Sequence, residues 1–224
     1  VKEFVKTIKG FKSLHCSFSE QNKGLADSII GGVSQVINQY GKVIVLEDDL
    51  VLMPNFLNFM NQGLEKYQNE DKVFSVCGDA YKVNFPDDYE YDAYLYTRTD
   101  SWGWATWKRA WDLLDTDARP LLTGLRFKRK KFDVGGGVCN YGNLYCQKVG
   151  LVESCFIRYY ACVLYTSDAA DDLTPLCCCS IGSFQQFLHP GSHMETLQAT
   201  FAMFLLHQTL PPCLFRNTLE VLFT

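Results

Sequence analysis

Apolar and polar positions in the first part of the chain follow the periods of strands and helices in turn. Leu14, Cys16 and Phe18 alternate with polar residues, which predicts a short strand. The stretch NKGLADSIIGGVSQVINQYGK then places apolar residues at helical spacing and stops at Gly41, which predicts a helix. Residues 42–46, KVIVL, predict a buried strand. Strand, helix and strand in this order predict a βαβ unit with a parallel pair of strands.

The same alternation continues further along the chain. Pro54 suits the first turn of a helix, and apolar residues follow it at helical spacing. The stretches KVFSVCG and AYLYT, residues 72–78 and 93–97, predict two further strands. Strands that alternate with helices are typical of an α/β protein, in which ligands gather at the carboxyl ends of strands.

All four tryptophans lie in the segment SWGWATWKRAW. Trp104, Trp107 and Trp111 are spaced as on one face of a helix, which predicts a core helix. Trp102 precedes Gly103 in a turn that follows a strand, where we expect an aromatic platform for a sugar or a base.

The predicted strand at residues 42–46 runs directly into three carboxylates, Glu47, Asp48 and Asp49. Neighbouring like charges repel, and removing them from water is costly unless a cation is near. The carboxylates are therefore solvated at the strand end, act as an acid–base pair, or hold a hard cation. The apolar stretches KVIVL and LVL on either side place them at the edge of a core, which favours a Mn²⁺ or Mg²⁺ site.

The charge balance changes near the end of the chain. Residues 1–163 carry 20 basic and 20 acidic residues, whereas residues 164–224 carry one basic residue, Arg216, and five acidic ones. The balanced part gives no electrostatic reason to expect a nucleic acid or an anionic membrane as a partner. No apolar run approaches the roughly 20 residues of a membrane span.

Cysteine usage changes in the same place. Of the ten cysteines, only Cys16 and Cys77 precede residue 139, and Cys177, Cys178 and Cys179 are consecutive. Their irregular spacing, without paired CxxC units, argues against a disulfide framework and against zinc, and favours a reduced cytosolic protein.

Three short stretches in the last part of the chain resemble laboratory sequences. VLYTSDAADD, residues 163–172, resembles a translated sequencing adapter, and GSHM, residues 191–194, resembles the remnant of a cleaved tag. LEVLF, residues 219–223, resembles a protease recognition sequence. We therefore predict a domain of residues 1–163 and a non-native tail of residues 164–224.

Three motifs of the first domain together resemble the nucleotide-sugar glycosyltransferases with a GT-A fold: VIVLEDDLVLMPNFLNFM, KVFSVCGDAY and YLYTRTDSWGWATW. These motifs resemble most those of bacterial members related to family 2. Their order along the chain is similar to that in animal N-acetylglucosaminyltransferase I. NKGLADSI resembles the stretch that precedes the metal motif in such enzymes. The resemblance covers about residues 1–163 and implies a Rossmann-like mixed sheet flanked by helices. It also implies truncation at the N-terminus, because the family's first strand and its base-reading acidic strand would precede residue 1.

The resemblance implies a metal-dependent, inverting transfer of a hexosyl or N-acetylhexosaminyl group in surface polysaccharide synthesis. The donor would be a nucleoside-diphosphate sugar, and the acceptor a hydroxyl of a glycan or lipid-linked glycan. Asp49, with Asp48, would bind Mn²⁺ or Mg²⁺ at the diphosphate, and Glu47 and Asp48 would contact the donor's ribose and sugar. The other implied donor-binding residues are Asn22, Lys23, Gly24 and Trp102.

An inverting enzyme also needs a carboxylate that takes the proton of the acceptor hydroxyl. Asp100, in TRTDSWGW, is a candidate base or acceptor-binding residue by its order in the chain, and Asp112 and Asp79 are rivals. In the animal enzyme the base lies after the Gly-Trp element, where the stretch FDVGGGVCNYGN has only Asp133. Arg98 could bind a phosphate or form a cross-strand salt bridge.

Two other functions fit the same carboxylates. A sugar-nucleotide nucleotidyltransferase also uses a carboxylate-held Mg²⁺, although its usual Gly-rich phosphate loop is not found in the sequence. A non-catalytic remnant that binds a nucleotide or a glycan is the other alternative, and a fragment without the family's first strands is expected to bind the donor poorly. We expect a cytoplasmic location, or a peripheral one at the inner face of the membrane.

Overall fold

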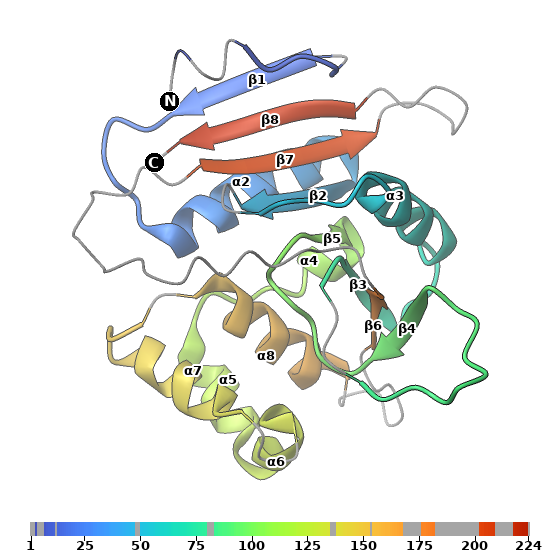
Figure 1. Ribbon diagram of the computed structural model, residues 1–224. Helices are drawn as coiled ribbons and strands as arrows, with labels where there is room; N and C mark the ends of the chain where they lie inside the picture. Colours follow the sequence, from blue (N-terminus) through green and yellow to red (C-terminus); the bar gives the residue numbers. More distant parts are fainter. Residues whose placement is uncertain are drawn as a thin grey trace, which may run out of the picture.

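The strands of the chain form one mixed eight-stranded sheet in the order β1-β8-β7-β2-β5-β3-β6-β4 (Figure 1). The computed structural model describes residues 3, 7–11, 13–47, 50–79, 83–134, 138–152, 154–167, 176–181, 202–208 and 217–223. The strands are β1 (Ser13–Phe18), β2 (Lys42–Glu47), β3 (Val73–Cys77), β4 (Ala93–Tyr96), β5 (Trp104–Trp107), β6 (Leu176–Ser180), β7 (Ala202–Gln208) and β8 (Asn217–Phe223). The predicted α/β class with a mixed sheet is confirmed.

Helices cover both faces of this sheet. Helices α2, α4 and α8 contribute to the core on one face, and α3 packs on the other face. Helices α5, α6 and α7 pack against α8 in a separate apolar cluster. The helices are α2 (Leu25–Tyr40), α3 (Phe56–Lys66), α4 (Lys108–Trp111), α5 (Ala118–Gly124), the short 3₁₀ helix η1 (Arg126–Lys128), α6 (Arg129–Phe132), α7 (Asn140–Lys148) and α8 (Cys155–Ser167).

Strand β2 lies inside the sheet and is buried on both faces. Val43 and Val45 belong to the core under α2, whereas Ile44 and Leu46 belong to the core under α3. A strand covered on both faces needs apolar residues at its buried positions, which explains the continuous run VIVL, residues 43–46. The strand predicted at residues 42–46 is therefore confirmed.

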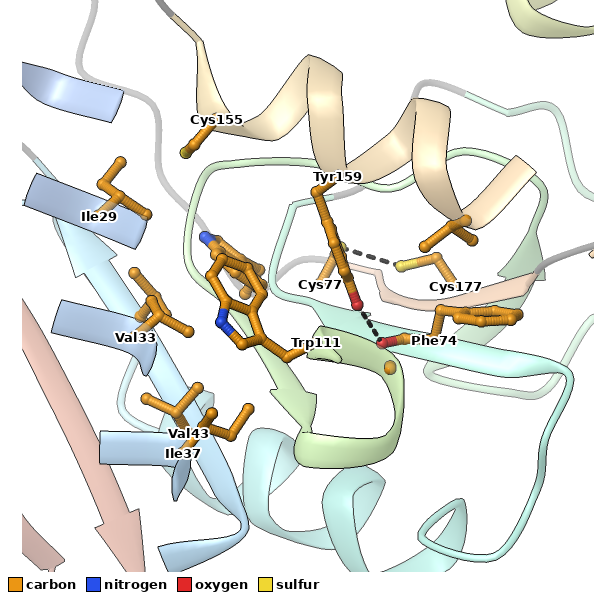
Figure 2. Close-up of a cluster of buried hydrophobic side chains, with 14 of the residues drawn as sticks. Ile29, Val33, Ile37, Val43, Phe74, Cys77, Trp111, Cys155, Tyr159 and Cys177 are labelled. Atoms are coloured by element: carbon orange, nitrogen blue, oxygen red, sulfur yellow. Dashed lines mark hydrogen bonds between the residues drawn. The ribbon is translucent and has the colours of Figure 1, made fainter. Parts of the chain in front are cut away.

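Helix α2 covers its face of the sheet with residues spaced three or four apart. Ile29, Val33 and Ile37 are buried in the same core as Trp111 (Figure 2). The helix ends at Gly41, whose φ of 78° is left-handed and whose N–H donates to the Ile37 carbonyl at 2.8 Å. Because glycine adopts this conformation without a steric penalty, the helix stop predicted at Gly41 is confirmed.

The predicted helix across the tryptophans is wrong for residues 104–107, which form strand β5. Trp104 and Trp107 consequently lie on opposite faces of the sheet, Trp104 in the core under α2 and Trp107 in the core under α3. Trp111 follows in the short helix α4 and returns to the first core. Because β5 is buried on both faces, apolar residues need not follow a two-residue period, and Trp and Thr favour strands. The prediction that these three tryptophans are core residues is confirmed.

The predicted βαβ unit differs from the structure in one respect. Strands β1 and β2 run parallel, but β8 and β7 lie between them. Local patterns in residues 13–47 could not predict this strand order, because the two intervening strands, β7 and β8, come from residues 202–208 and 217–223. The boundary predicted between residues 163 and 164 stays a prediction; in the structure α8 continues to Ser167, and β6, β7 and β8 pair with the sheet.

Two helical glycines provide a test of the packing of α3 on the sheet. A methyl group on Gly63 would lie 2.8 Å from the Val76 side chain, whereas one on Gly31 of α2 would meet nothing within 4 Å. We expect Gly63→Ala to lower the free energy of unfolding by about 1–2 kcal/mol through overpacking. Gly31→Ala should raise it by about 0.5–1 kcal/mol, because alanine favours the helix. Urea denaturation measures both, and equal effects would contradict the packing.

Truncation after Ser167 removes β6, β7 and β8 and tests how these three strands together contribute to the fold. Strand β6 lies between β3 and β4, and Cys177 and Cys178 are buried in the two separate cores. We expect the truncated chain to lose at least about 3 kcal/mol of its free energy of unfolding, because buried side chains are removed from both cores. Thermal denaturation followed by circular dichroism measures this. An unchanged midpoint would instead support a native domain that ends near residue 163.

Candidate functional site at the carboxyl edge of the sheet

Strand β5 brings the ends of two other strands together. It pairs antiparallel with β2 and with β3, and its first residue, Trp104, is in register with Val45 of β2 and with Cys77 of β3. The carboxyl ends of β2 and β3 therefore flank the beginning of β5. Glu47, at the end of β2, and the turn of residues 100–103 before β5 consequently lie at the same edge of the sheet.

The turn of residues 100–103 is attached to the end of β3 by backbone contacts. The Gly78 N–H donates to the Gly103 carbonyl at 2.8 Å. The Asp100 N–H donates to the Cys77 Sγ at 3.2 Å, and this thiol lies 3.5 Å from the Asp100 carbonyl oxygen. Gly103 has a φ of 61°, which is left-handed and favours glycine. The sequence Trp-Gly-Trp thus fixes the turn in one conformation.

Within this turn the Asp100 carboxylate accepts a hydrogen bond from the Trp102 N–H at 3.1 Å. A side-chain oxygen that accepts from the backbone two residues later stabilises the turn. Asp100 is partly buried, whereas 42% of the Trp102 surface is exposed. Asp100 therefore holds the turn, and the Trp102 side chain is accessible at this edge of the sheet; its role as an aromatic platform stays a prediction.

The negative charge of Glu47 acts on the first turn of α8, which the sequence did not predict. Burial raises the pKa of the Cys155 thiol to about 12. The negative charge of Glu47 contributes to this increase, whereas the positive charge of Arg158 lowers the pKa. Cys155 is buried in the same core as Ile29 of α2 (Figure 2). No pattern in the sequence indicated this electrostatic effect, because it joins residues more than a hundred positions apart.

A buried hydrogen-bond network positions α8 on the sheet. The Tyr159 hydroxyl donates to the Phe74 carbonyl at 3.0 Å and lies 2.9 Å from the Thr106 Oγ1 (Figure 2). The Thr106 hydroxyl also donates to the Phe74 carbonyl, at 2.8 Å. Burial raises the pKa of Tyr159 far above its usual range, so the phenol stays neutral and keeps its proton for this contact.

The loop of residues 22–24 is also at the carboxyl edge, between β1 and α2. The Asn22 Oδ1 accepts a hydrogen bond from the Gly24 N–H at 2.8 Å, and Gly24 has a φ of 75°. Lys23 is exposed. Because β8 and β7 separate β1 from β2, strand pairing does not bring this loop next to Glu47.

Asp112 lies at the opposite edge of the sheet. It follows β5, whose last residue, Trp107, is in register with Lys42 at the start of β2. Its carboxylate forms a salt bridge of 2.6 Å with Lys108 on the surface. The structure therefore does not bring Asp112 together with Glu47.

Asp133 has a structural role at the start of α7. Only 7% of its surface is exposed, and its carboxylate accepts from the Tyr141 N–H at 2.8 Å and pairs with Arg129 at 3.3 Å. It therefore holds the first turn of α7. Asp79 follows β3 at the carboxyl edge, next to the strand that carries the 100–103 turn.

Asp48 and Asp49, the predicted metal ligands, lie outside the described residues. Among the residues that the structure does describe, no group of three or more His, Cys, Asp or Glu side chains is arranged to hold a metal ion. The described part of the predicted acidic motif is Glu47, a partly buried carboxylate at the end of β2.

The comparisons with known proteins give no relative for this chain. No protein-family model, no curated protein and no solved structure matches it. A search for helices long and apolar enough to cross a membrane found none in the described part of the chain.

Fluorescence quenching tests the placement of Trp102. Trp104, Trp107 and Trp111 are 2–5% exposed, so Trp102 is the tryptophan that a solute in water can reach. We expect Trp102→Phe to remove most of the acrylamide-accessible emission, because the other three indoles are inside the two cores. Emission that stays equally accessible in this variant would show that another tryptophan faces water.

Proposed function

We propose that the chain is a glycosyltransferase domain of the GT-A type, which moves a sugar from a nucleoside-diphosphate sugar to a hydroxyl group. The observation that carries this proposal is the pairing of β5 with both β2 and β3, because it gathers Glu47, Asp100 and Trp102 at one edge of the sheet. Ligands of α/β sheets bind at this edge. Such an edge, with carboxylates on one strand and an exposed indole on the next, suits a metal–diphosphate and a sugar ring.

The carboxylates at the end of β2 fit a hard divalent cation. Glu47 and the two aspartates that follow it supply the oxygen ligands that Mn²⁺ and Mg²⁺ prefer, and one or two of them are sufficient beside a substrate diphosphate. In this proposal Asp49 and Asp48 hold the ion. The bound ion would neutralise the negative charge that develops on the nucleoside diphosphate as it leaves.

The other residues of the edge bind and orient the sugar. The Trp102 ring offers an apolar face for a sugar, and the bonds from Gly78 and Asp100 keep the turn that carries it in place. Asp100 is the carboxylate of this turn. In this proposal it acts as the base that accepts the proton of the acceptor hydroxyl.

Binding without transfer is the second candidate function. Asp133, the acidic residue of the segment after the Gly-Trp element, is buried and used in a helix cap, and Asp100 accepts from the backbone of its own turn. A domain without an available base would still bind the metal–diphosphate. The two functions differ in one measurement, which is the release of sugar from the bound donor.

Substitution of Asp49 tests the proposed metal role. We expect Asp49→Asn to lower Mn²⁺-dependent release of nucleoside diphosphate from sugar donors by about 100-fold or more, because a metal ligand is lost where negative charge develops. Asp112→Asn is the matched control, since this carboxylate lies at the opposite edge of the sheet. Its rate should stay within about twofold of the wild type, as for most surface substitutions.

The outcomes separate the proposals. Equal rates in Asp49→Asn and the wild type would remove Asp49 from the metal site and contradict the proposed mechanism. Calorimetric binding of Mn²⁺ with a nucleoside diphosphate, lost in Asp49→Asn but accompanied by no sugar release in the wild type, would favour binding without transfer. Absence of both binding and release from the wild type, across uridine and guanosine donors, would overturn both functions.

A further inference from the structure

Three cysteine thiols meet inside the core that α2 and α8 cover. The Cys177 Sγ lies 2.9 Å from the Cys77 Sγ, as the dashed line in Figure 2 marks, and 3.6 Å from the Cys179 Sγ. At most 1% of the surface of each of these residues is exposed. Two non-bonded sulfur atoms rarely approach as closely as those of Cys77 and Cys177, so the core already holds this pair near bonding distance.

The pairing of β3 with β6 explains why these thiols meet. The strands run parallel, with Ser75 in register with Cys177 and Cys77 in register with Cys179. Side chains two positions apart lie on the same face of a strand, so Cys177 and Cys179 both face the side of Cys77. Cys178 faces the other way and belongs to the core under α3.

We propose that Cys77 and Cys177 are a modification site, at which a disulfide joins β3 to β6. The proposal takes β6, which pairs with β3, as part of the folded protein, in place of the boundary predicted after residue 163. The oxidant class is a low-molecular-weight disulfide, for example oxidised glutathione. One protein thiolate attacks a glutathione sulfur and releases one glutathione thiolate, which forms a mixed disulfide. The second protein thiolate then attacks the protein sulfur of this mixed disulfide and releases the second glutathione. The two protons of the cysteines end on the two reduced glutathione molecules.

The geometry favours this bond over other uses of the cluster. The two sulfurs need to approach by less than about 1 Å to reach the disulfide length of roughly 2.05 Å. Among the described residues no set of three ligands is arranged for a metal ion, so a thiolate–metal centre is not supported. Burial raises the pKa of Cys77 and of Cys177, so the pair reacts while the strands form or open rather than in the closed core.

Cys179 is the one rival partner that the register allows. Neighbouring strands lie about 4.8 Å apart, which is within the span of a disulfide, and Cys179 is directly opposite Cys77. The contact of 2.9 Å is nevertheless made by Cys177. Single substitutions at the two positions distinguish these partners.

The bond would stabilise the fold because it closes a long loop. The two cysteines are 100 residues apart in the chain, and a crosslink of this length removes much of the conformational freedom of the unfolded state. We expect the oxidised chain to unfold at a temperature about 5–10 °C above that of the reduced chain.

Peptide mass spectrometry of the whole chain tests the proposal. The chain is refolded from denaturant in reduced and oxidised glutathione, its remaining thiols are alkylated, and it is digested with trypsin without reduction. The peptide of residues 73–82 contains Cys77 alone. The peptide of residues 159–216 contains Cys177 together with Cys162, Cys178, Cys179 and Cys213, so the substituted chains identify which cysteine is linked. We expect these two peptides to be linked in the wild type, in Cys179→Ala and in the control Cys146→Ala, and the link to be absent from Cys177→Ala.

Three results would overturn the assignment. The first is a fully alkylated Cys77 in the folded wild type. The second is a link that survives in Cys177→Ala, whether or not it is lost in Cys179→Ala. The third is a wild-type chain whose unfolding temperature is the same with and without reductant. This last measurement needs no substitution, so it remains decisive if a variant fails to fold.

Discussion

The antiparallel pairing of β5 with both β2 and β3 is the constraint on which the candidate site depends. Because Trp104 is in register with residues at the ends of both strands, the turn before it must lie beside their carboxyl ends. Hydrogen bonds from Gly78 and Asp100 then fix that turn to β3. The acidic end of β2 and the exposed Trp102 therefore share an edge as a consequence of strand register alone.

Burial of α8 stabilises the same pairing from one side. The Tyr159 hydroxyl and the Thr106 side chain both use the Phe74 carbonyl, so the helix is held against β3 and β5 together. Loss of such a buried contact leaves an unsatisfied polar group, which typically costs about 1–3 kcal/mol. The negative charge of Glu47 acts on Cys155 at the start of this helix, so α8 and the acidic end of β2 are linked electrostatically.

The sequence predicted the local features and missed the non-local ones. The run of residues 42–46 and the stop at Gly41 were predictable, because burial on both faces and a left-handed helix end each need particular residues. The strand at Trp104 was not, since the tryptophans are spaced as on a helix and a strand buried on both faces shows no two-residue period. Strand order and the packing of α8 on the sheet depend on contacts between distant residues, and hydrophobic periodicity carries no information about them.

Anomalous diffraction from crystals grown with Mn²⁺ and a nucleoside diphosphate tests the central claim most directly. The account predicts a manganese peak at the carboxyl edge, between the end of β2 at Glu47 and the turn that carries Trp102, with the diphosphate bound to the ion. A bound diphosphate with its manganese at another edge of the sheet, or held without any contact to the residues that follow β2, would contradict it.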